Sequence, residues 1–293
     1  MVEAKVKPNL TVQDYDTTVE NAWCPGCGNF GILRAVKKTL AEMGLEPHQV
    51  LIVSGIGQAG KFPHYIKCNM LNELHGRTLP AAVAAKIVNP QLTVIVVGGD
   101  GDGYGEGGNH FINAMLRNVN ITYLVHNNQV YGLTKGQASP TSDRGFVTKT
   151  TPTGAWEPLN PLALAIATNA SFVARSYSAD TDHLVNILKM AINHKGFALV
   201  DILQPCVTYN HVNTYQFYQT HIYKLDGDKS YDPSDRAAAF NKAIEPGEKI
   251  PIGLFYKVDR PVFEERLDAA KGIPLVKQKL DPLAFESLLE EYT

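Results

Sequence analysis

The chain has 293 residues, a formal net charge of −2 and 19% charged residues, which predicts a globular protein with an ample core. This charge balance excludes a basic surface of the kind that binds nucleic acid. No apolar run approaches membrane-spanning length and residues 1–18 lack a signal-peptide core, so we expect a cytoplasmic protein without a membrane partner.

Apolar periodicity and turn residues predict alternating helices and strands behind an extended arm at residues 1–20. The expected helices are 29–43, ended by Gly44, then 78–88, 105–118, 159–168 and a helix capped by Asp180 that runs through 192. The expected strands are 50–53, 92–97, 121–125, 172–174 and 197–203. Residues 55–78 are glycine-rich and are expected to be mostly irregular. This alternation predicts an α/β fold with a doubly wound parallel sheet.

The most informative segment is a predicted strand–helix–strand unit with polar residues at both strand ends. Gly99-Asp100-Gly101 follows the first strand, and Asn127-Asn128 follows the second just under thirty residues later. Both strand ends lie on one edge of a parallel sheet, where open α/β folds bind ligands. Asp100, Asn128 and the carbonyl of Val130 would supply the oxygen ligands that Mg²⁺ prefers, with a diphosphate completing the shell. The alternative is a plain strand-to-helix turn, and the spacing with a strand on each side argues against it.

Four cysteines leave several interpretations open. Cys24 and Cys27 form a C-x-x-C pair before the first helix, while Cys68 and Cys206 stand alone. A thioredoxin-type redox pair would need a preceding strand, and a structural zinc site usually has two such pairs. An Fe–S cluster accepts scattered thiolates, and simple burial is the alternative that suits Cys68 best. Cys206 follows a strand end at the predicted ligand edge, which favours a cluster near the diphosphate site.

After Cys206 the composition changes to tyrosines, prolines and charged residues. This segment is too aromatic for simple disorder. We therefore predict three regions: an N-terminal arm at 1–20, a diphosphate-binding domain with cysteine ligands at 21–206, and a C-terminal extension at 207–293 that packs on the core or on a partner subunit.

Together these residues resemble the β subunit of 2-oxoacid:ferredoxin oxidoreductases, which bind thiamine diphosphate (ThDP). The resemblance covers roughly residues 20–210 in family order. Its motifs are Trp23-Cys-Pro-Gly-Cys-Gly-Asn-Phe-Gly-Ile32, Ser54-Gly-Ile-Gly57, His75-Gly76-Arg77, Gly99-Asp-Gly101, His126-Asn-Asn128, Tyr131-Gly-Leu-Thr134 and Gln204-Pro-Cys206. The implied fold is a doubly wound sheet of the ThDP diphosphate-binding type with a C-terminal extension.

The resemblance implies a set of cofactor and catalytic residues. The diphosphate site would draw on Gly99, Gly101, Asp102, Gly132, Leu133 and Thr134. His75 and Arg77 resemble family residues near the cofactor, with a loop-stabilising pair as the alternative. Lys61 could meet a substrate carboxylate or could simply be solvated.

One departure concerns the fourth ligand of a [4Fe–4S] cluster. Many family members carry a cysteine directly after the Gly-Ile-Gly sequence, and this chain has Gln58 there. Cys68 is the remaining cysteine, so we predict Cys24, Cys27, Cys68 and Cys206 as ligands.

The implied reaction is oxidative decarboxylation of a 2-oxoacid, with coenzyme A as acyl acceptor and ferredoxin as electron acceptor, reversible as CO₂ fixation. ThDP enzymes activate the cofactor with a glutamate from a second domain, which this chain is too short to hold. We therefore expect an α subunit and an (αβ)₂ assembly. Overall resemblance favours 2-oxoglutarate, with pyruvate, a branched 2-oxoacid, or a non-redox ThDP decarboxylase or synthase subunit as alternatives.

Overall fold

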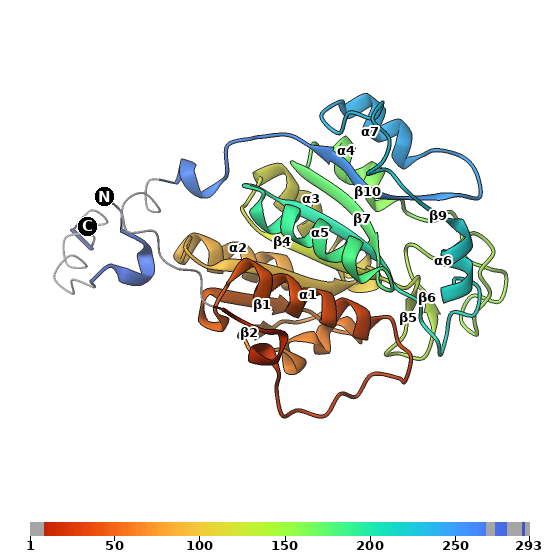
Figure 1. Ribbon diagram of the computed structural model, residues 1–293, viewed down its shortest axis with the longest axis horizontal. Coiled ribbons are helices and arrows are strands. Elements are labelled where there is room, and N and C mark those ends of the chain that lie inside the picture. The colour runs from red at the N-terminus through yellow and green to blue at the C-terminus, as the bar shows by residue number, and fades with distance from the viewer. Residues whose placement is uncertain (1–8, 268–272, 280–288, 291–293) are drawn as a thin grey trace.

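A computed structural model describes residues 9–267, 273–279 and 289–290. Within this part, eight strands form one sheet in the order β2-β1-β3-β4-β8-β7-β10-β9 (Figure 1). Neighbouring strands are parallel except for β7 and β10, which are antiparallel. The strands are β1 (Val50–Ser54), β2 (Asn69–Asn72), β3 (Thr93–Gly99), β4 (Thr122–Asn127), β7 (Phe172–Tyr177), β8 (Ala198–Leu203), β9 (Ile222–Lys224) and β10 (Ile250–Lys257).

Helices cover both faces of this sheet, as a doubly wound fold requires. Helices α1 and α5 pack side by side on one face, and α2, α3, α4 and α7 cover the other (Figure 1). The helices are α1 (Asn29–Met43), α2 (Thr78–Val88), α3 (Gly108–Arg117), α4 (Pro161–Ala167), α5 (Thr181–Asn193), α6 (Tyr215–His221) and α7 (Arg236–Ala243). A small hairpin of β5 (Val130–Tyr131) and β6 (Gln137–Ala138) lies with α6 beyond one end of the sheet.

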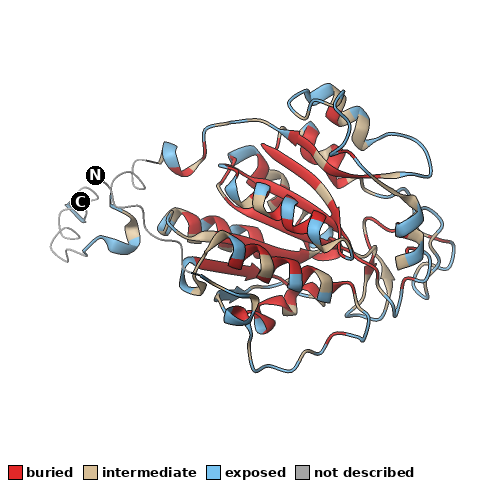
Figure 2. Ribbon diagram, viewed as in Figure 1, coloured by how far each residue is buried: buried red, intermediate tan, exposed pale blue. Residues whose placement is uncertain are grey.

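Alternating strand residues build two hydrophobic cores, one on each face. Ile95 and Val97 of β3 pack with α1 and α5, whereas Val94 and Val96 pack with α2, α3 and α4. The central strands are buried along their length, as Figure 2 shows by their red colour. This two-sided burial explains why these strands are continuous apolar runs in the sequence.

The predicted elements agree closely with the observed ones where a cap or an apolar run defines them. The helices predicted at 29–43 and 78–88 are present with those bounds, and Gly44 ends α1 with a left-handed φ of 67°. The carboxylate of Asp180 accepts a hydrogen bond of 3.2 Å from the His183 amide at the start of α5. Two elements differ: residues 55–78 contain a short 3₁₀ helix and β2, and α3 begins after a π-helical turn at Gly101–Glu106.

The C-terminal segment is part of the sheet, because β9 and β10 continue it beyond β7. Asn118 joins this segment to the core. Its amide nitrogen donates to the carbonyls of Arg260 and Pro261, and its amide oxygen accepts from the Phe197 amide at 3.0 Å and the Ser171 hydroxyl at 2.6 Å. Of the predicted arm, residues 1–8 lie outside the described residues, and Tyr15 is buried against the core.

None of the helices in the described ranges combines the length and apolar character needed to cross a bilayer.

We expect Asn118→Gly to lower the free energy of unfolding by roughly 2–4 kcal/mol, because it removes several hydrogen bonds to buried groups. Glycine tolerates the left-handed φ of 56° at this position, so the loss reports on the side chain alone. Urea unfolding followed by circular dichroism measures it. Asn169→Gly is the matched control: Asn169 has φ 59° and its side chain accepts one hydrogen bond, from Tyr256. Equal losses in the two variants would contradict this account of Asn118.

Candidate active site

The predicted ligand edge carries a cavity where β1, β3 and β4 end. Asp100, Asn128 and Val130 line it, together with Gly99, Gly101, Asp102, Gly132, Leu133, Thr134 and His75. The structure thus brings the predicted diphosphate and magnesium residues together in one place. Ile56, Gly57, Gln58, Ala59 and Tyr131 complete the lining.

The Asp100 carboxylate lies at the base of this cavity and is only 1% exposed. Its Oδ2 accepts hydrogen bonds from the hydroxyls of Ser139 (2.5 Å) and Thr141 (2.7 Å), and its Oδ1 from the Asn128 amide at 3.3 Å. Burial outweighs these bonds and raises the pKa of Asp100 from 3.8 to about 6. No cationic side chain in the described part of the chain pairs with it. A buried carboxylate that has hydrogen bonds and lacks a counter-charge is a suitable ligand for a divalent cation.

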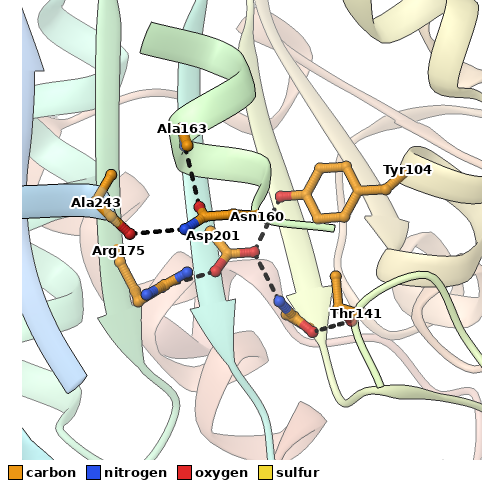
Figure 3. Close-up of polar contacts among 8 residues, drawn as sticks. Tyr104, Thr141, Asn160, Ala163, Arg175, Asp201 and Ala243 are labelled. Atoms are coloured by element: carbon orange, nitrogen blue, oxygen red, sulfur yellow. Dashed lines mark hydrogen bonds and ion pairs between the residues drawn. The ribbon is translucent and has the colours of Figure 1, made fainter. Parts of the chain in front are cut away.

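A hydrogen-bonded network joins Thr141, one of the partners of Asp100, to β4, β7 and β8 (Figure 3). Thr141 donates to the side-chain oxygen of Asn127 at 2.9 Å, and the Asn127 amide nitrogen donates to Asp201 at 3.1 Å. Asp201 is fully buried and also accepts from Tyr104 and from Arg175, whose Nε lies 2.9 Å away. The network therefore links the proposed metal ligand to a buried ion pair and fixes its position.

Asp102 joins three loops around the cavity. Its Oδ1 accepts hydrogen bonds from the amides of Ile56 (3.1 Å) and Gly76 (2.9 Å), and lies 3.1 Å from Nδ1 of His75. A Cβ at Gly55 would lie 2.1 Å from this carboxylate, so only glycine fits there. Burial raises the pKa of Asp102. This residue therefore holds the cavity wall in place, and its carboxylate faces loop amides.

The glycines of the π-helical turn allow close packing beneath the cavity. A Cβ at Gly103 would lie 1.9 Å from the Tyr123 hydroxyl, and one at Gly101 would lie 2.3 Å from the Tyr131 ring. Without side chains, the backbone amides of this turn reach the cavity and can face phosphate oxygens.

Two predicted catalytic residues do not line the cavity. Arg77 is exposed and begins α2, on the far side of the turn at Gly76 from His75. Lys61 lies in the 3₁₀ helix Ala59–Tyr65 and also lies outside the lining. The structure supports a cavity position for His75, and does not support one for Arg77 or Lys61.

A second cavity adjoins the first and contains three of the cysteines, Cys24, Cys27 and Cys206. Hydrogen bonds join the segment that carries Cys24 and Cys27 to the segment that carries Cys206. The Gly28 amide donates to the Pro205 carbonyl, and the Thr208 hydroxyl donates to the Cys24 sulfur at 3.2 Å. Burial, together with the neighbouring thiols of Cys206 and Cys24, raises the pKa of Cys27 to about 11. Gln58, Asn128 and Gly132 line both cavities, so the two share a wall.

Cys68 lies elsewhere, and the structure does not bring it together with the other three cysteines. It precedes β2, whose Asn69 pairs with Leu51 at the start of β1, so it lies at the opposite edge of the parallel sheet from Cys206. Lys37 is the charged residue that acts on it, and Lys37 lies about 12 Å along α1 from the start of that helix at Asn29, at 1.5 Å per residue. Partial burial against the hydrophobic core raises the pKa of Cys68 to about 12.

Ser139 and Thr141, which hold Asp100, were not predicted. They lie in the long polar segment 132–154, and only its unusual length between regular elements indicated a functional loop. Tyr131 was also missed as a wall residue, because nothing in the sequence shows which neighbour its ring covers.

The fold and the cavity define a domain of the ThDP-dependent enzymes. A family model described as "Thiamine pyrophosphate enzyme, C-terminal TPP binding domain" matches residues 53–202, and a model of the C-terminal part of the pyruvate ferredoxin oxidoreductase β chain matches residues 206–272. A 2-oxoacid:ferredoxin oxidoreductase β subunit from Aeropyrum pernix is 51% identical over 87% of this chain and 84% of its own length.

More distant relatives point to the same family. A 2-oxoglutarate synthase subunit KorB from Methanocaldococcus jannaschii is 35% identical over 84% of this chain and 90% of its own length. A structure of 2-oxoglutarate:ferredoxin oxidoreductase from Magnetococcus marinus, with 2-oxoglutarate, coenzyme A and succinyl-CoA bound, superimposes with a TM-score of 0.85 at 38% identity over 88% of both chains. This chain belongs to the β subunits of the 2-oxoacid:ferredoxin oxidoreductases.

We expect Asp100→Asn to change the pH dependence of stability. The carboxyl pKa is raised by folding, so Asp100 stabilises the wild type below pH 4 and loses that contribution as the pH rises through about 6. The stability of Asp100→Asn relative to wild type should therefore increase by roughly 2–2.5 kcal/mol between pH 4 and 8. Urea unfolding in the presence of a chelator measures this difference. Asp182→Asn, at a carboxylate with 86% side-chain exposure, should show no such trend, and a flat difference for Asp100→Asn would contradict the role of burial.

Proposed function

We propose that this chain is the β subunit of a coenzyme A-dependent 2-oxoacid:ferredoxin oxidoreductase that decarboxylates 2-oxoglutarate, with ThDP and Mg²⁺ in the first cavity and an Fe–S cluster in the second. The observation that carries the proposal is the common wall of Gln58, Asn128 and Gly132. It would bring a cluster next to the cofactor, within reach for electron transfer.

The residues of the first cavity suit the polar half of the cofactor. Asp100, Asn128 and the carbonyl of Val130 would hold Mg²⁺, and the amides of the Gly101–Glu106 turn would face the diphosphate. ThDP supplies a nucleophilic carbon and an electron sink for decarboxylation. The Tyr131 ring packs against Gly101 and the Asp102 carboxylate accepts a hydrogen bond from the Gly76 amide, so the turn would present its backbone amides to a diphosphate in fixed positions.

The cavity lacks one group that the chemistry needs. Among the described residues, its only carboxylates are Asp100, assigned to the metal, and Asp102, assigned to the loop amides. No glutamate of the described ranges lines it, so the acid that activates the cofactor would come from another chain. This supports an α subunit that closes the site.

Exposed apolar side chains lie on the segments that line the cavity or lead to it, as expected of a partner surface. Ile56 and Leu133 line the cavity with 36% and 46% exposure, and Leu74, next to His75, is 74% exposed. Met70 and Leu71 on the edge strand β2 are also exposed. Together these residues form an apolar rim of the kind that protein interfaces cover.

The substrate is proposed from the relatives. The Methanocaldococcus relative and the Magnetococcus structure are both named for 2-oxoglutarate, and the latter has coenzyme A bound. Pyruvate or a branched 2-oxoacid remains the alternative substrate, and a reducing ferredoxin would drive the reaction towards CO₂ fixation. We further propose an (αβ)₂ assembly in the cytoplasm, where four free cysteines would stay reduced.

The proposal predicts that this chain alone does not reduce a viologen dye with any 2-oxoacid, because the activating acid is absent. With its α subunit, coenzyme A and ThDP, we expect dye reduction that is fastest with 2-oxoglutarate. Steady-state assays across 2-oxoglutarate, pyruvate and branched acids measure this. Turnover by the isolated chain contradicts the shared site, and decarboxylation without dye reduction favours the non-redox alternative.

Leu74→Asp should weaken binding of the α subunit at least tenfold, because it places a charge in the apolar rim. Isothermal titration or co-purification of the tagged subunits measures the change. Leu116→Asp is the matched control, since Leu116 is 56% exposed near the end of α3, the helix that leads from the cavity edge back to the start of β4. If both variants bind the α subunit as tightly as wild type does, the rim is not the interface.

A further inference from the structure

The second cavity is lined by three thiols and by carboxamide residues, of which Gln58 stands where many family members carry a cysteine. Cys24 and Cys27 lie on the segment before α1, Cys206 lies after β8, and Gln58 closes the side shared with the first cavity. The backbone carbonyl of Gln58 accepts a 2.7 Å hydrogen bond from the Trp23 indole, which fixes Gln58 beside Cys24. Four side chains from three separate segments therefore surround one space.

The arrangement of the three thiols does not suit a site for a single metal ion. Among the described residues, no three His, Cys, Asp or Glu side chains are arranged to hold one metal ion. A structural zinc site would require its thiolates to converge on one point about 2.3 Å from each sulfur. A cluster instead binds each thiolate to a different iron and keeps them apart.

Buried polar atoms without partners also point to a bound group here. Nδ2 of Asn29, Oε1 of Gln58 and Oε1 of Gln204 have no hydrogen-bond partner, and all three residues line the second cavity. Asn29 and Gln204 are each 1% exposed. Unpaired buried polar atoms are rare in folded proteins, so three around one cavity indicate that something else fills it.

We infer, resting on the proposed function, that this chain holds its cluster through only three thiolates, those of Cys24, Cys27 and Cys206. The fourth iron faces the Gln58 carboxamide and is exchangeable. Cys68 cannot complete the set, because it lies at the opposite edge of the sheet.

The difference between thiolate and amide donors explains why one iron would be exchangeable. Thiolates are soft ligands that bind cluster irons tightly, whereas an amide oxygen is a hard, neutral and weak donor for them. On mild oxidation the [4Fe–4S]²⁺ form loses one electron to an added one-electron oxidant such as ferricyanide. It then releases Fe²⁺ and leaves [3Fe–4S]⁺, which balances both iron and charge. Reduction in the presence of Fe²⁺ restores the cubane.

The test uses the complete αβ complex, reconstituted anaerobically with Fe²⁺ and sulfide. Iron and sulfide content and electron paramagnetic resonance spectra are recorded before and after one equivalent of ferricyanide with EDTA. Wild type should lose about one iron of four per cluster, keep its sulfide, gain the resonance of a three-iron cluster, and recover with Fe²⁺ and dithionite.

Two variants locate the exchangeable iron. Gln58→Cys should retain all its iron under the same treatment, because a thiolate then binds the fourth iron. Cys68→Ser is the matched control and should behave as wild type does. If the Gln58→Cys subunit does not form a complex that holds a cluster, the iron loss and the resonance of wild type alone decide whether one iron is exchangeable.

Wild type that keeps four irons through oxidation, or Cys68→Ser that loses its cluster, overturns the inference and leaves the proposed function intact. A complex that binds no iron overturns both the inference and the proposed cluster. A complex that shows the exchangeable iron and no turnover with any 2-oxoacid supports the inference and contradicts the proposed activity.

Discussion

The structure of the site depends on one buried charge, the Asp100 carboxylate at the end of β3. Taking an ionised carboxylate out of water costs several kcal/mol unless other groups compensate for it. Ser139, Thr141 and the Asn128 amide offset part of that cost, and the remainder appears as a raised pKa of about 6. Because the compensating groups come from two separate segments, the carboxylate also brings those segments together. A cation that binds Asp100 would remove the remaining cost, so folding prepares the site for a metal.

The parallel sheet determines what lies next to this charge. Strands β1, β3, β4 and β8 point the same way, so the segments that follow them gather at one edge. The segment after β1 supplies Gln58, the one after β4 supplies Asn128, and the one after β8 supplies Cys206. The adjacency of a diphosphate-type cavity and a cysteine cavity is therefore a consequence of strand order, and the shared wall follows from it.

The sequence predicted those parts of the site that lie directly at strand ends. Asp100 and Asn128 follow apolar strands, so sheet geometry alone was enough to place them together. Cys68 lies apart from the other cysteines because the chain returns to the opposite edge of the sheet over residues 59–68, before β2 begins, and nothing in this irregular-looking stretch indicated that return. Arg77 failed for a local reason, since the left-handed turn at Gly76 directs the chain away from His75. Ser139 and Thr141 lie in a loop without periodicity, where sequence gives no through-space information.

Three kinds of incomplete feature occur together at the ligand edge. Three unpaired buried amide atoms line the cysteine cavity, an uncompensated carboxylate lies in the neighbouring one, and apolar side chains are exposed on the segments that line that cavity or lead to it. Each would be destabilising in an isolated protein, and each has a different natural complement: a cluster, a metal–diphosphate group and a partner surface. A chain that evolved to function alone would have little reason to keep all three costs side by side. Because all three features lie together, this chain is better explained as one half of a shared active site than as a complete active site.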